Sequence, residues 1–331
     1  MVIIMANRLS ERPEPTEVEI ELTNYCNASC VACPRDQLTA KKGFMDDTTF
    51  YTIIEKYEKY RDKLSINKIV KDIQYPFISF AGMGEPLLHK KIFDYIKYVR
   101  SRGFKAILFS NISLLNEENA NKLVEAGINH INISFWGINE EEYSRSMGLD
   151  FATSLKNVEY MAKLASQKGI TLIISWIKNK YITSTTKEIV DFWSIRGLEV
   201  DIDEDNQPWN RGGYLSNSLF QENFDLYPSV DYDLDVWCSQ LFFTDTVCWN
   251  GDVVICSCDY YQKENVLGNL LHITPDEITN KKYEILSSKI RIPICLRCKK
   301  IDRNYSLGSS PWDSLLTEEE KQKYHYNSVN Y

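Results

Sequence analysis

Short apolar runs alternate with amphipathic helical stretches along the first two thirds of the chain, and this alternation limits the fold more than any other feature. Repeated βα units of this kind build a parallel sheet, because parallel strands are joined by helical crossovers. We therefore expect an α/β fold with a partial (β/α)6 barrel over residues 16–204. The six expected strands are Val18–Leu22, Phe77–Ala81, Ala106–Ser110, His130–Phe135, Thr171–Ile177 and Leu198–Ile202.

Glycine marks the joint between helix and strand in four of these units. Gly103, Gly127, Gly169 and Gly197 are each followed by an apolar residue close to the start of the next strand. Glycine adopts the left-handed conformation after a helix without a steric penalty. The four glycines therefore predict the same helix ending in four successive units.

Composition and charge exclude several classes of function. The chain has 331 residues, 38 Lys plus Arg against 46 Asp plus Glu, and a net charge of −8, with no basic run that would bind a phosphate backbone. No stretch has the length of a signal peptide or of a spanning helix. We expect a cytoplasmic protein that binds neither nucleic acid nor membrane. Thiols stay reduced in that compartment, so nine cysteines indicate metal sites and not disulfides.

Cys26, Cys30 and Cys33 form a CxxxCxxC loop directly after the first expected strand. Thiolates are the preferred ligands of iron–sulfur clusters. Three thiolates leave one metal position open to a substrate or cosubstrate, as an incomplete protein ligand set does in catalytic zinc sites. A zinc site with three cysteine ligands is the alternative.

The segment from Leu22 to Arg35, LTNYCNASCVACPR, resembles the cluster loop of radical S-adenosylmethionine (radical SAM) enzymes with a C-terminal SPASM or twitch domain. The resemblance covers residues 16 to 300. It implies that S-adenosylmethionine chelates the open iron of a [4Fe-4S] cluster. It also implies reductive cleavage of that cosubstrate to methionine and a 5′-deoxyadenosyl radical, which removes a hydrogen atom from the substrate.

The segment Gly82-Met83-Gly84-Glu85-Pro86 follows the second expected strand. It resembles the family motif that holds the methionine amino group, with Gly82 and Gly84 allowing close backbone approach and Glu85 neutralising the ammonium. An ordinary strand-to-helix turn is the structural alternative.

Further cofactor-binding candidates lie near the ends of later strands, where barrel enzymes gather their polar groups. By the resemblance, they contact the carboxylate or ribose of the cosubstrate. Without the resemblance, each of them is equally well explained as a helix cap, a turn-forming residue or a solvated surface charge. The candidates are Ser110, Asn111, Ser134 and, with weaker support, Arg145 and Asn179.

The C-terminal third resembles a twitch domain with one auxiliary [4Fe-4S] cluster over residues 236–300, after a bridge at 205–235 and before a tail at 301–331. The expected ligands are Cys238, Cys256, Cys295 and Cys298. A zinc ribbon using Cys256-x-Cys258 and Cys295-x-x-Cys298 is the alternative.

A hairpin is expected where Phe242–Val247 and Val253–Ile255 flank the segment Trp249-Asn250-Gly251-Asp252. Asn250 and Gly251 supply two positive-φ turn positions in that reading.

Cys248 and Cys258 are left over from the two ligand sets. Each is either a small buried apolar residue or a thiol that returns a hydrogen atom to a substrate radical. Arg211, in the bridge, is a candidate for orienting a substrate hydroxyl or phosphate, or is a surface arginine.

The cysteine spacing is similar to that of 2-deoxy-scyllo-inosamine dehydrogenases of this family. The leading hypothesis is therefore dehydrogenation of a sugar- or cyclitol-like small molecule, with the auxiliary cluster accepting one electron. The alternatives are a radical epimerase of a sugar or peptide, a maturase of ribosomally made peptides, and a non-catalytic zinc-binding protein. The enzymatic readings require a one-electron reductant such as flavodoxin or ferredoxin.

Overall fold

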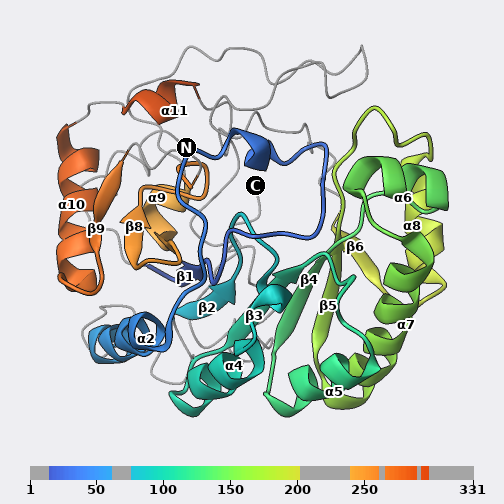
Figure 1. Cartoon of the computed structure of the whole chain (residues 1–331), viewed down its shortest axis with the longest axis horizontal. Coiled ribbons are helices and arrows are strands. Elements are labelled where there is room, and N and C mark those ends of the chain that lie inside the picture. Colours follow the sequence, from blue (N-terminus) through green and yellow to red (C-terminus); the bar gives the residue numbers. More distant parts are fainter. Residues whose placement is uncertain (1–14, 62–75, 202–238, 261–264, 289–291, 298–331) are drawn as a thin grey trace, which may run out of the picture.

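The computed structural model describes residues 15–61, 76–201, 239–260, 265–288 and 292–297. Its centre is a nine-stranded sheet in the order β6-β5-β4-β3-β2-β1-β7-β8-β9 (Figure 1). β1 to β6 pair in parallel and correspond to the six expected strands, so the α/β fold with a partial barrel is confirmed. These strands are β1 (Glu17–Ile20), β2 (Phe77–Phe80), β3 (Ala106–Ser110), β4 (His130–Ser134), β5 (Thr171–Ser175) and β6 (Glu199–Asp201).

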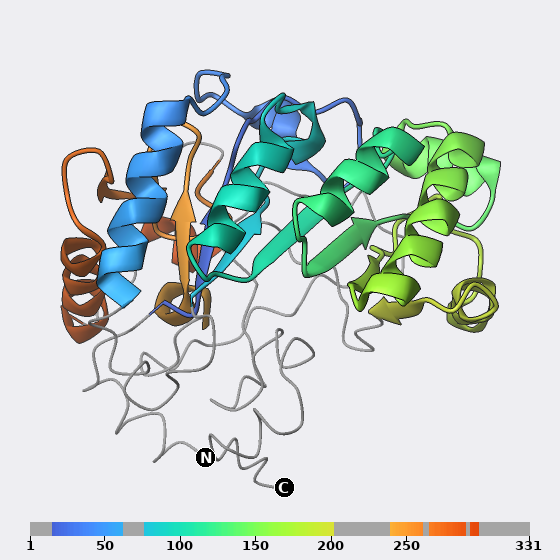
Figure 2. The ribbon, with the colours of Figure 1, turned by 90° about the horizontal axis from the view of Figure 1, so that it is seen from below.

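Helices cover one face of this parallel sheet (Figure 2). Val18 and Ile20 are fully buried on that face, in the same core as Phe50 and Ile53 of α2. None of the helices in the described segments is long and apolar enough to cross a membrane. The helices of the parallel part are α2 (Asp47–Arg61), α4 (Ile92–Ser101), α5 (Glu117–Glu125), α6 (Glu140–Met147), α7 (Phe151–Lys168) and α8 (Thr186–Ser194), with short 3-10 turns η1 (Pro34–Gln37) and η2 (Pro86–Leu88).

The four expected helix-to-strand joints are confirmed. Gly103, Gly127, Gly169 and Gly197 have φ values of 78°, 85°, 66° and 70°. These values lie in the left-handed region, where a side chain would be strained. The glycines thus let the chain reverse from each helix into the next strand.

The C-terminal strands extend the same sheet. β7 (Thr244–Val247) pairs in parallel with β1, and β8 (Asp252–Val254) and β9 (Val266–Asn269) follow antiparallel. The expected strand start at Phe242 is wrong, because α9 (Ser239–Phe243) continues to Phe243. Two further helices follow, α10 (Pro275–Ser288) and α11 (Pro293–Arg297). The division at 236–300 stays a prediction, and the bridge and the tail lie outside the described residues.

The β7–β8 hairpin is present, but its turn differs from the expected one. Gly251 has a φ of 86°, whereas Asn250 is not in the positive-φ region. The N–H of Gly251 donates to the carbonyl of Cys248 at 2.9 Å, and the N–H of Cys248 donates to the carbonyl of Asp252 at 2.8 Å. The loop therefore has three residues and ends in one left-handed glycine, a common alternative to the two-residue turn.

Candidate functional site

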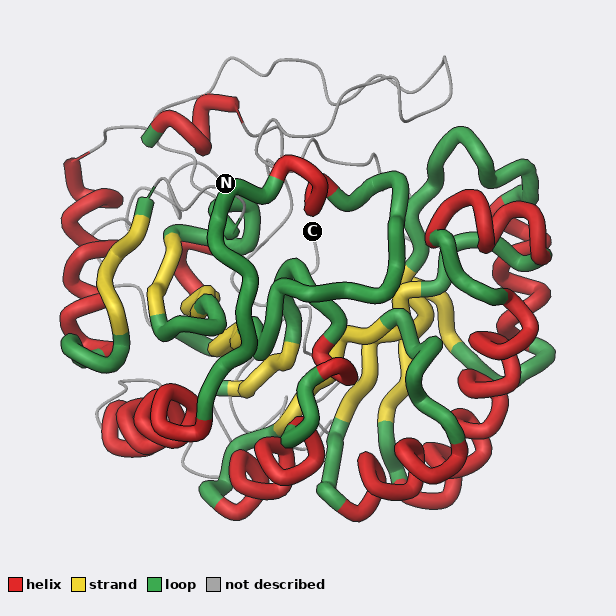
Figure 3. The backbone as a smooth tube through the Cα atoms, in the orientation of Figure 1, coloured by secondary structure: helices red, strands yellow, loops and turns green. Residues whose placement is uncertain are grey.

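The three cysteines of the CxxxCxxC loop lie between β1 and α2, in a wide loop interrupted by η1 (Figure 3). The end of α6 anchors this loop. The N–H of Ser29 donates to the carbonyl of Met147, and the N–H of Val31 donates to the carbonyl of Ser146, both at 2.9 Å. The loop is therefore held at the carboxyl ends of the parallel strands, where active sites of such folds form.

Burial dominates the chemistry of these thiols. It raises the pKa of Cys26 and of Cys30. The charges of Glu85 and Cys33 raise the pKa of Cys26 further, and those of Cys33 and Cys26 raise that of Cys30. The Sγ atom of Cys26 accepts a backbone hydrogen bond from Ala28 at 3.5 Å. Thiolates crowded in this way are stabilised by metal ions, which replace their protons. The donor set therefore fits an iron–sulfur cluster.

Within the described part of the chain, no group of three Cys, His, Asp or Glu side chains is placed to hold a single metal ion.

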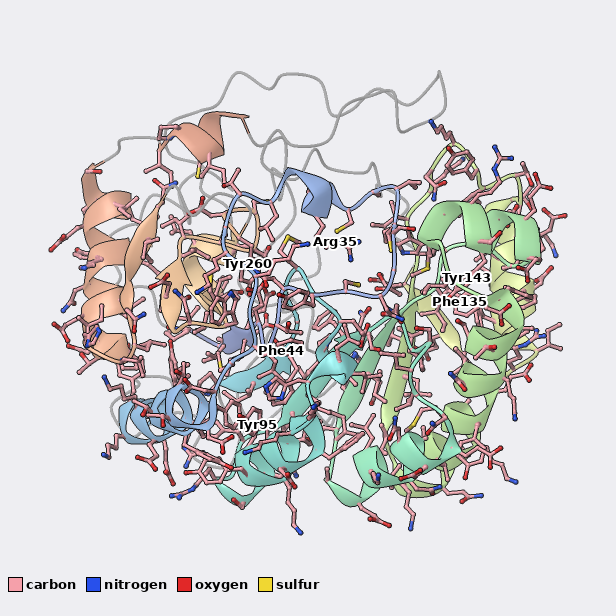
Figure 4. The ribbon with its side chains drawn as sticks, viewed as in Figure 1. Arg35, Phe44, Tyr95, Phe135, Tyr143 and Tyr260 are labelled. Carbon is pink, nitrogen blue, oxygen red and sulfur yellow. The ribbon has the colours of Figure 1, made fainter. Side chains whose placement is uncertain are left out.

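Arg35 is a cation within the cluster loop, two residues after Cys33. Its Nη1 donates to the carbonyl of Cys26 at 3.1 Å, and Figure 4 labels its side chain within the loop. Its positive charge lowers the pKa of Cys26 and Cys30, against the larger effect of burial. The guanidinium therefore both fixes the backbone and offsets the negative charge of the thiolates.

Glu85 joins three strand ends. Its backbone N–H donates to the carbonyl of Tyr25 at 2.9 Å, and its carboxylate accepts from Ser110 Oγ at 2.8 Å, the N–H of Asn111 at 2.8 Å and the N–H of Leu87 at 3.1 Å. Burial raises its pKa to about 7, although these hydrogen bonds oppose the shift. A carboxylate accepts about four hydrogen bonds, so these leave room for one from a ligand ammonium.

Asn111 lies against the cluster loop. Its Nδ2 donates to Asn27 Oδ1 at 3.0 Å and approaches Cys26 Sγ at 4.0 Å. The next residue, Ile112, has a φ of 59°, which is strained for a β-branched side chain. Asn157 Nδ2 donates to the carbonyl of Ile112 at 3.1 Å and helps to hold this conformation.

The remaining cofactor candidates differ in their surroundings. Ser134 lies at the end of β4, paired in register with Ser175 of β5. Arg145 lies on α6, where it forms an exposed ion pair with Glu141 and stacks on Tyr181. Asn179 is buried and accepts from Ser146 Oγ at 3.2 Å. The assignment of Arg145 and Asn179 to the cofactor site stays a prediction.

The leftover cysteines occupy two different environments. Cys248 is fully buried directly after β7 and packs with Val254, Tyr260 and the motif residue Met83. Cys258 is buried in the main hydrophobic core. The first position therefore adjoins the carboxyl end of β7.

The auxiliary-cluster ligands are only partly described. Cys256 and Cys295 are half-buried and pack against the main hydrophobic core. Arg211, Cys238 and Cys298 lie outside the described residues. The assignments of these five residues stay predictions.

Sequence reasoning missed two buried residues near the motif. Glu21 accepts from the N–H of Met83 at 3.0 Å, and Tyr260 lies beside Glu19 and Glu21, whose charges add to burial in raising its pKa. The alternation Glu17, Glu19, Glu21 in the first strand is the signal that could have found Glu21. In a strand, this spacing places all three on one face.

Gly84 offers a direct test of how closely the motif and the cluster loop pack. A Cβ atom at Gly84 would lie 2.1 Å from the carbonyl oxygen of Thr23 and 2.4 Å from that of Tyr25. We expect Gly84→Ala to lower the free energy of unfolding by about 3 kcal/mol, because the backbone of the motif or of the cluster loop must shift to make room for the methyl group. Gly169→Ala is the control: it has φ +66° and open space around it, so we expect a loss of about 1 kcal/mol. Equal losses in urea unfolding would contradict this packing.

Comparisons with known proteins agree with this geometry. Residues 20–180 match the model of the radical SAM superfamily. AdoMet-dependent heme synthase from Methanosarcina barkeri is 28% identical over 173 residues, which cover 52% of this chain and 46% of the relative. The chain spans less than half the length of the first curated relatives that it matches.

Two solved structures share the fold. BtrN in complex with AdoMet and 2-DOIA has a TM-score of 0.57 at 19% identity, covering 88% of this chain and 94% of that one. Streptococcus suis SuiB bound to precursor peptide SuiA also has a TM-score of 0.57, at 14% identity, covering 89% and 70%. The family match covers the cysteine loop, the Glu85 motif and the strands β2 to β5. Residues 20–180 of this chain are therefore a radical SAM domain.

Proposed function

We propose that this protein is a radical SAM oxidoreductase that oxidises a carbinol carbon of a polar, sugar- or cyclitol-like small molecule. When bound, the [4Fe-4S] cluster and S-adenosylmethionine supply the radical that removes a hydrogen atom from that carbon. The hydroxyl proton would pass to a base, and an auxiliary cluster held by the C-terminal cysteines would serve as the acceptor of the remaining electron. The product is a ketone.

The polarity of the inner face of the sheet carries this proposal. Strand residues that face away from the helices include Glu19, paired in register with Ser79, and Ser134, paired with Ser175. Asn132 lies on the same side of β4 as Ser134, since strand side chains alternate. Hydroxyl, amide and carboxylate groups suit a substrate rich in hydroxyl groups.

Different residues of this chain would hold the cluster and the cosubstrate. Cys26, Cys30 and Cys33 would ligate the cluster. Glu85 would accept a hydrogen bond from the cosubstrate ammonium at its remaining acceptor position. Gly84 lets the motif lie against the carbonyl groups of the cluster loop, as the missing space for a Cβ atom indicates.

The auxiliary cluster would be held by Cys238, Cys256, Cys295 and Cys298. β7, the first strand of the hairpin in this region, is hydrogen-bonded along β1, the strand that leads into the Cys26 loop. A shared sheet fixes the hairpin relative to the first cluster. Such a fixed separation favours electron transfer from the substrate to the second cluster.

The test uses protein reconstituted anaerobically with iron and sulfide. With S-adenosylmethionine, dithionite and a panel of inositols, aminocyclitols and sugars, we expect 5′-deoxyadenosine and a ketone in equal amounts for at least one compound. Cleavage of S-adenosylmethionine without oxidation of any panel member, together with modification of a peptide, would overturn the proposed substrate class.

Epimerisation is the second candidate, favoured by the position of Cys248 beside Met83. Run in D2O, the same assay separates the two reactions. An epimerase product takes deuterium from the exchanged thiol, and Cys248→Ala abolishes its formation, whereas Cys258→Ala does not. A dehydrogenase forms the ketone with either variant, and its product carries no deuterium at the oxidised carbon.

A further inference from the structure

Two exposed aromatic rings stack on each other beside the cluster loop. Tyr25 is 42% exposed and Phe44 is 46% exposed, and their ring centroids lie 5.1 Å apart with planes 19° from parallel. Single exposed apolar side chains are common on protein surfaces, but a stacked pair forms a flat apolar contact area. Such a pair is typical of the centre of a protein interface.

The backbone holds this pair in a fixed position. Thr23 Oγ1 donates to the carbonyl of Gly43 at 2.7 Å, and the N–H of Gly43 donates to Asn24 Oδ1 at 2.9 Å. The indole of Trp249 fills the space where a Gly43 side chain would lie, and its Nε1 donates to the carbonyl of Lys41 at 3.2 Å. A surface already ordered before binding loses little conformational entropy when a partner docks.

Two lysines lie between Tyr25 and Phe44 in the same loop. Lys41 and Lys42 are exposed, and Lys42 Nζ lies 5.9 Å from the centroid of the Tyr25 ring. In the described segments, no carboxylate forms a salt bridge with either lysine. The acidic residues that follow are engaged elsewhere: Asp46 caps α2 through the N–H of Thr49, and Asp47 pairs with Lys91. On a chain with a net charge of −8, this local cationic area selects an acidic partner.

The pair also lies next to the first cluster ligand. Tyr25 immediately precedes Cys26, and its carbonyl accepts the N–H of Glu85 at 2.9 Å. A partner seated on Tyr25 and Phe44 would therefore lie within a short distance of the Cys26 thiolate. This is the arrangement that an electron donor requires.

We propose that Tyr25, Phe44, Lys41 and Lys42 form the docking surface for a flavodoxin, an acidic electron carrier that exposes the apolar edge of its flavin. The stacked rings would contact that edge, and the two ammonium groups would face the surrounding carboxylates. The anionic reduced flavin loses one electron and keeps its proton, the cluster gains that electron, and no bond is broken. The proposal rests on the proposed radical SAM function.

The test compares two reductants on the reconstituted full chain. Lys41→Glu combined with Lys42→Glu, and separately Phe44→Ala, should each lower flavodoxin-supported cleavage of S-adenosylmethionine by about tenfold at limiting flavodoxin and low salt. The apparent KM for flavodoxin should rise, while dithionite-supported cleavage stays unchanged. Lys163→Glu with Lys168→Glu, on exposed positions of α7, makes the same change in charge and should have no effect.

Three other outcomes would contradict either the docking proposal or the proposed function. Flavodoxin-supported rates within twofold of the unaltered chain in both docking variants would overturn the proposal. So would variants that lose support by a ferredoxin and keep support by flavodoxin. Failure of the unaltered chain to cleave S-adenosylmethionine with dithionite would instead contradict the proposed function.

Discussion

Replacing Cys30 by alanine is expected to remove one of the two proposed clusters and to abolish cleavage of S-adenosylmethionine. Reconstituted protein should fall from about eight to about four iron atoms per chain. Burial and the charges of Cys33 and Cys26 raise the pKa of the Cys30 thiol. A methyl group there provides no ligand, and two thiolates cannot retain a cluster with an open iron. Iron analysis and assay of 5′-deoxyadenosine with dithionite measure both effects.

Cys258→Ala is the matched control for this experiment. Cys258 is also buried, but it lies in the hydrophobic core and outside both proposed ligand sets. We expect this variant to keep about eight iron atoms. If Cys258→Ala loses four iron atoms, the auxiliary ligand set is wrong, and the Cys256-x-Cys258 pairing gains support. If Cys30→Ala keeps eight, the CxxxCxxC loop does not hold a cluster.

The sequence predicts the parallel part of the fold well because local patterns determine it. Alternation of apolar residues in His130–Ser134 and glycines such as Gly169 at helix ends are properties of a few neighbouring residues. The motif at Glu85 is found in the same way, because the residues that it joins follow successive strands. Neighbouring parallel strands bring their carboxyl ends together, so their order along the chain also predicts their proximity.

Contacts between distant parts of the chain were not predictable in this way. β7 pairs with β1 across more than two hundred residues, and no local pattern in Thr244–Val247 distinguishes this pairing from a separate small sheet. The turn at Asn250 differs because hairpin loops of two and three residues use the same residue types. The surroundings of Arg145 depend on Tyr181 from a later loop, which its own helix does not reveal.

Lys282 and Asp245 show why this distant pairing is stable. Both side chains are buried, with exposures of 2% and 0%. Lys282 Nζ donates to Asp245 Oδ1 and to the carbonyl of Thr244, each at 2.6 Å, and Tyr57 Oη donates to Asp245 Oδ2 at 2.6 Å. Burial and the charge of Asp245 raise the pKa of Tyr57, so it remains a donor. These three hydrogen-bonded side chains thereby join α10, β7 and α2.

Lys282→Met is therefore expected to lower the free energy of unfolding by about 3–5 kcal/mol, because it leaves the Asp245 carboxylate buried without its cation. Urea unfolding of the reconstituted protein measures the loss. Adding Asp245→Asn should restore at least half of it, since the amide removes the charge and still accepts from Tyr57. Lys281→Met is the control: it removes one hydrogen bond to the carbonyl of Leu267 and should cost about 1 kcal/mol.

The double variant distinguishes a charge effect from a packing effect. If Asp245→Asn makes Lys282→Met less stable still, the lysine acts through its aliphatic stem and not through its charge. If the charge dominates, the single variant should also lose oxidation of the substrate while it keeps cleavage of S-adenosylmethionine. Cys26, Cys30 and Cys33 lie in the loop after β1 and would remain in place, whereas the β7–β8 hairpin would lose its fixed position beside β1. Electron transfer to an auxiliary cluster depends on that position, and radical formation does not.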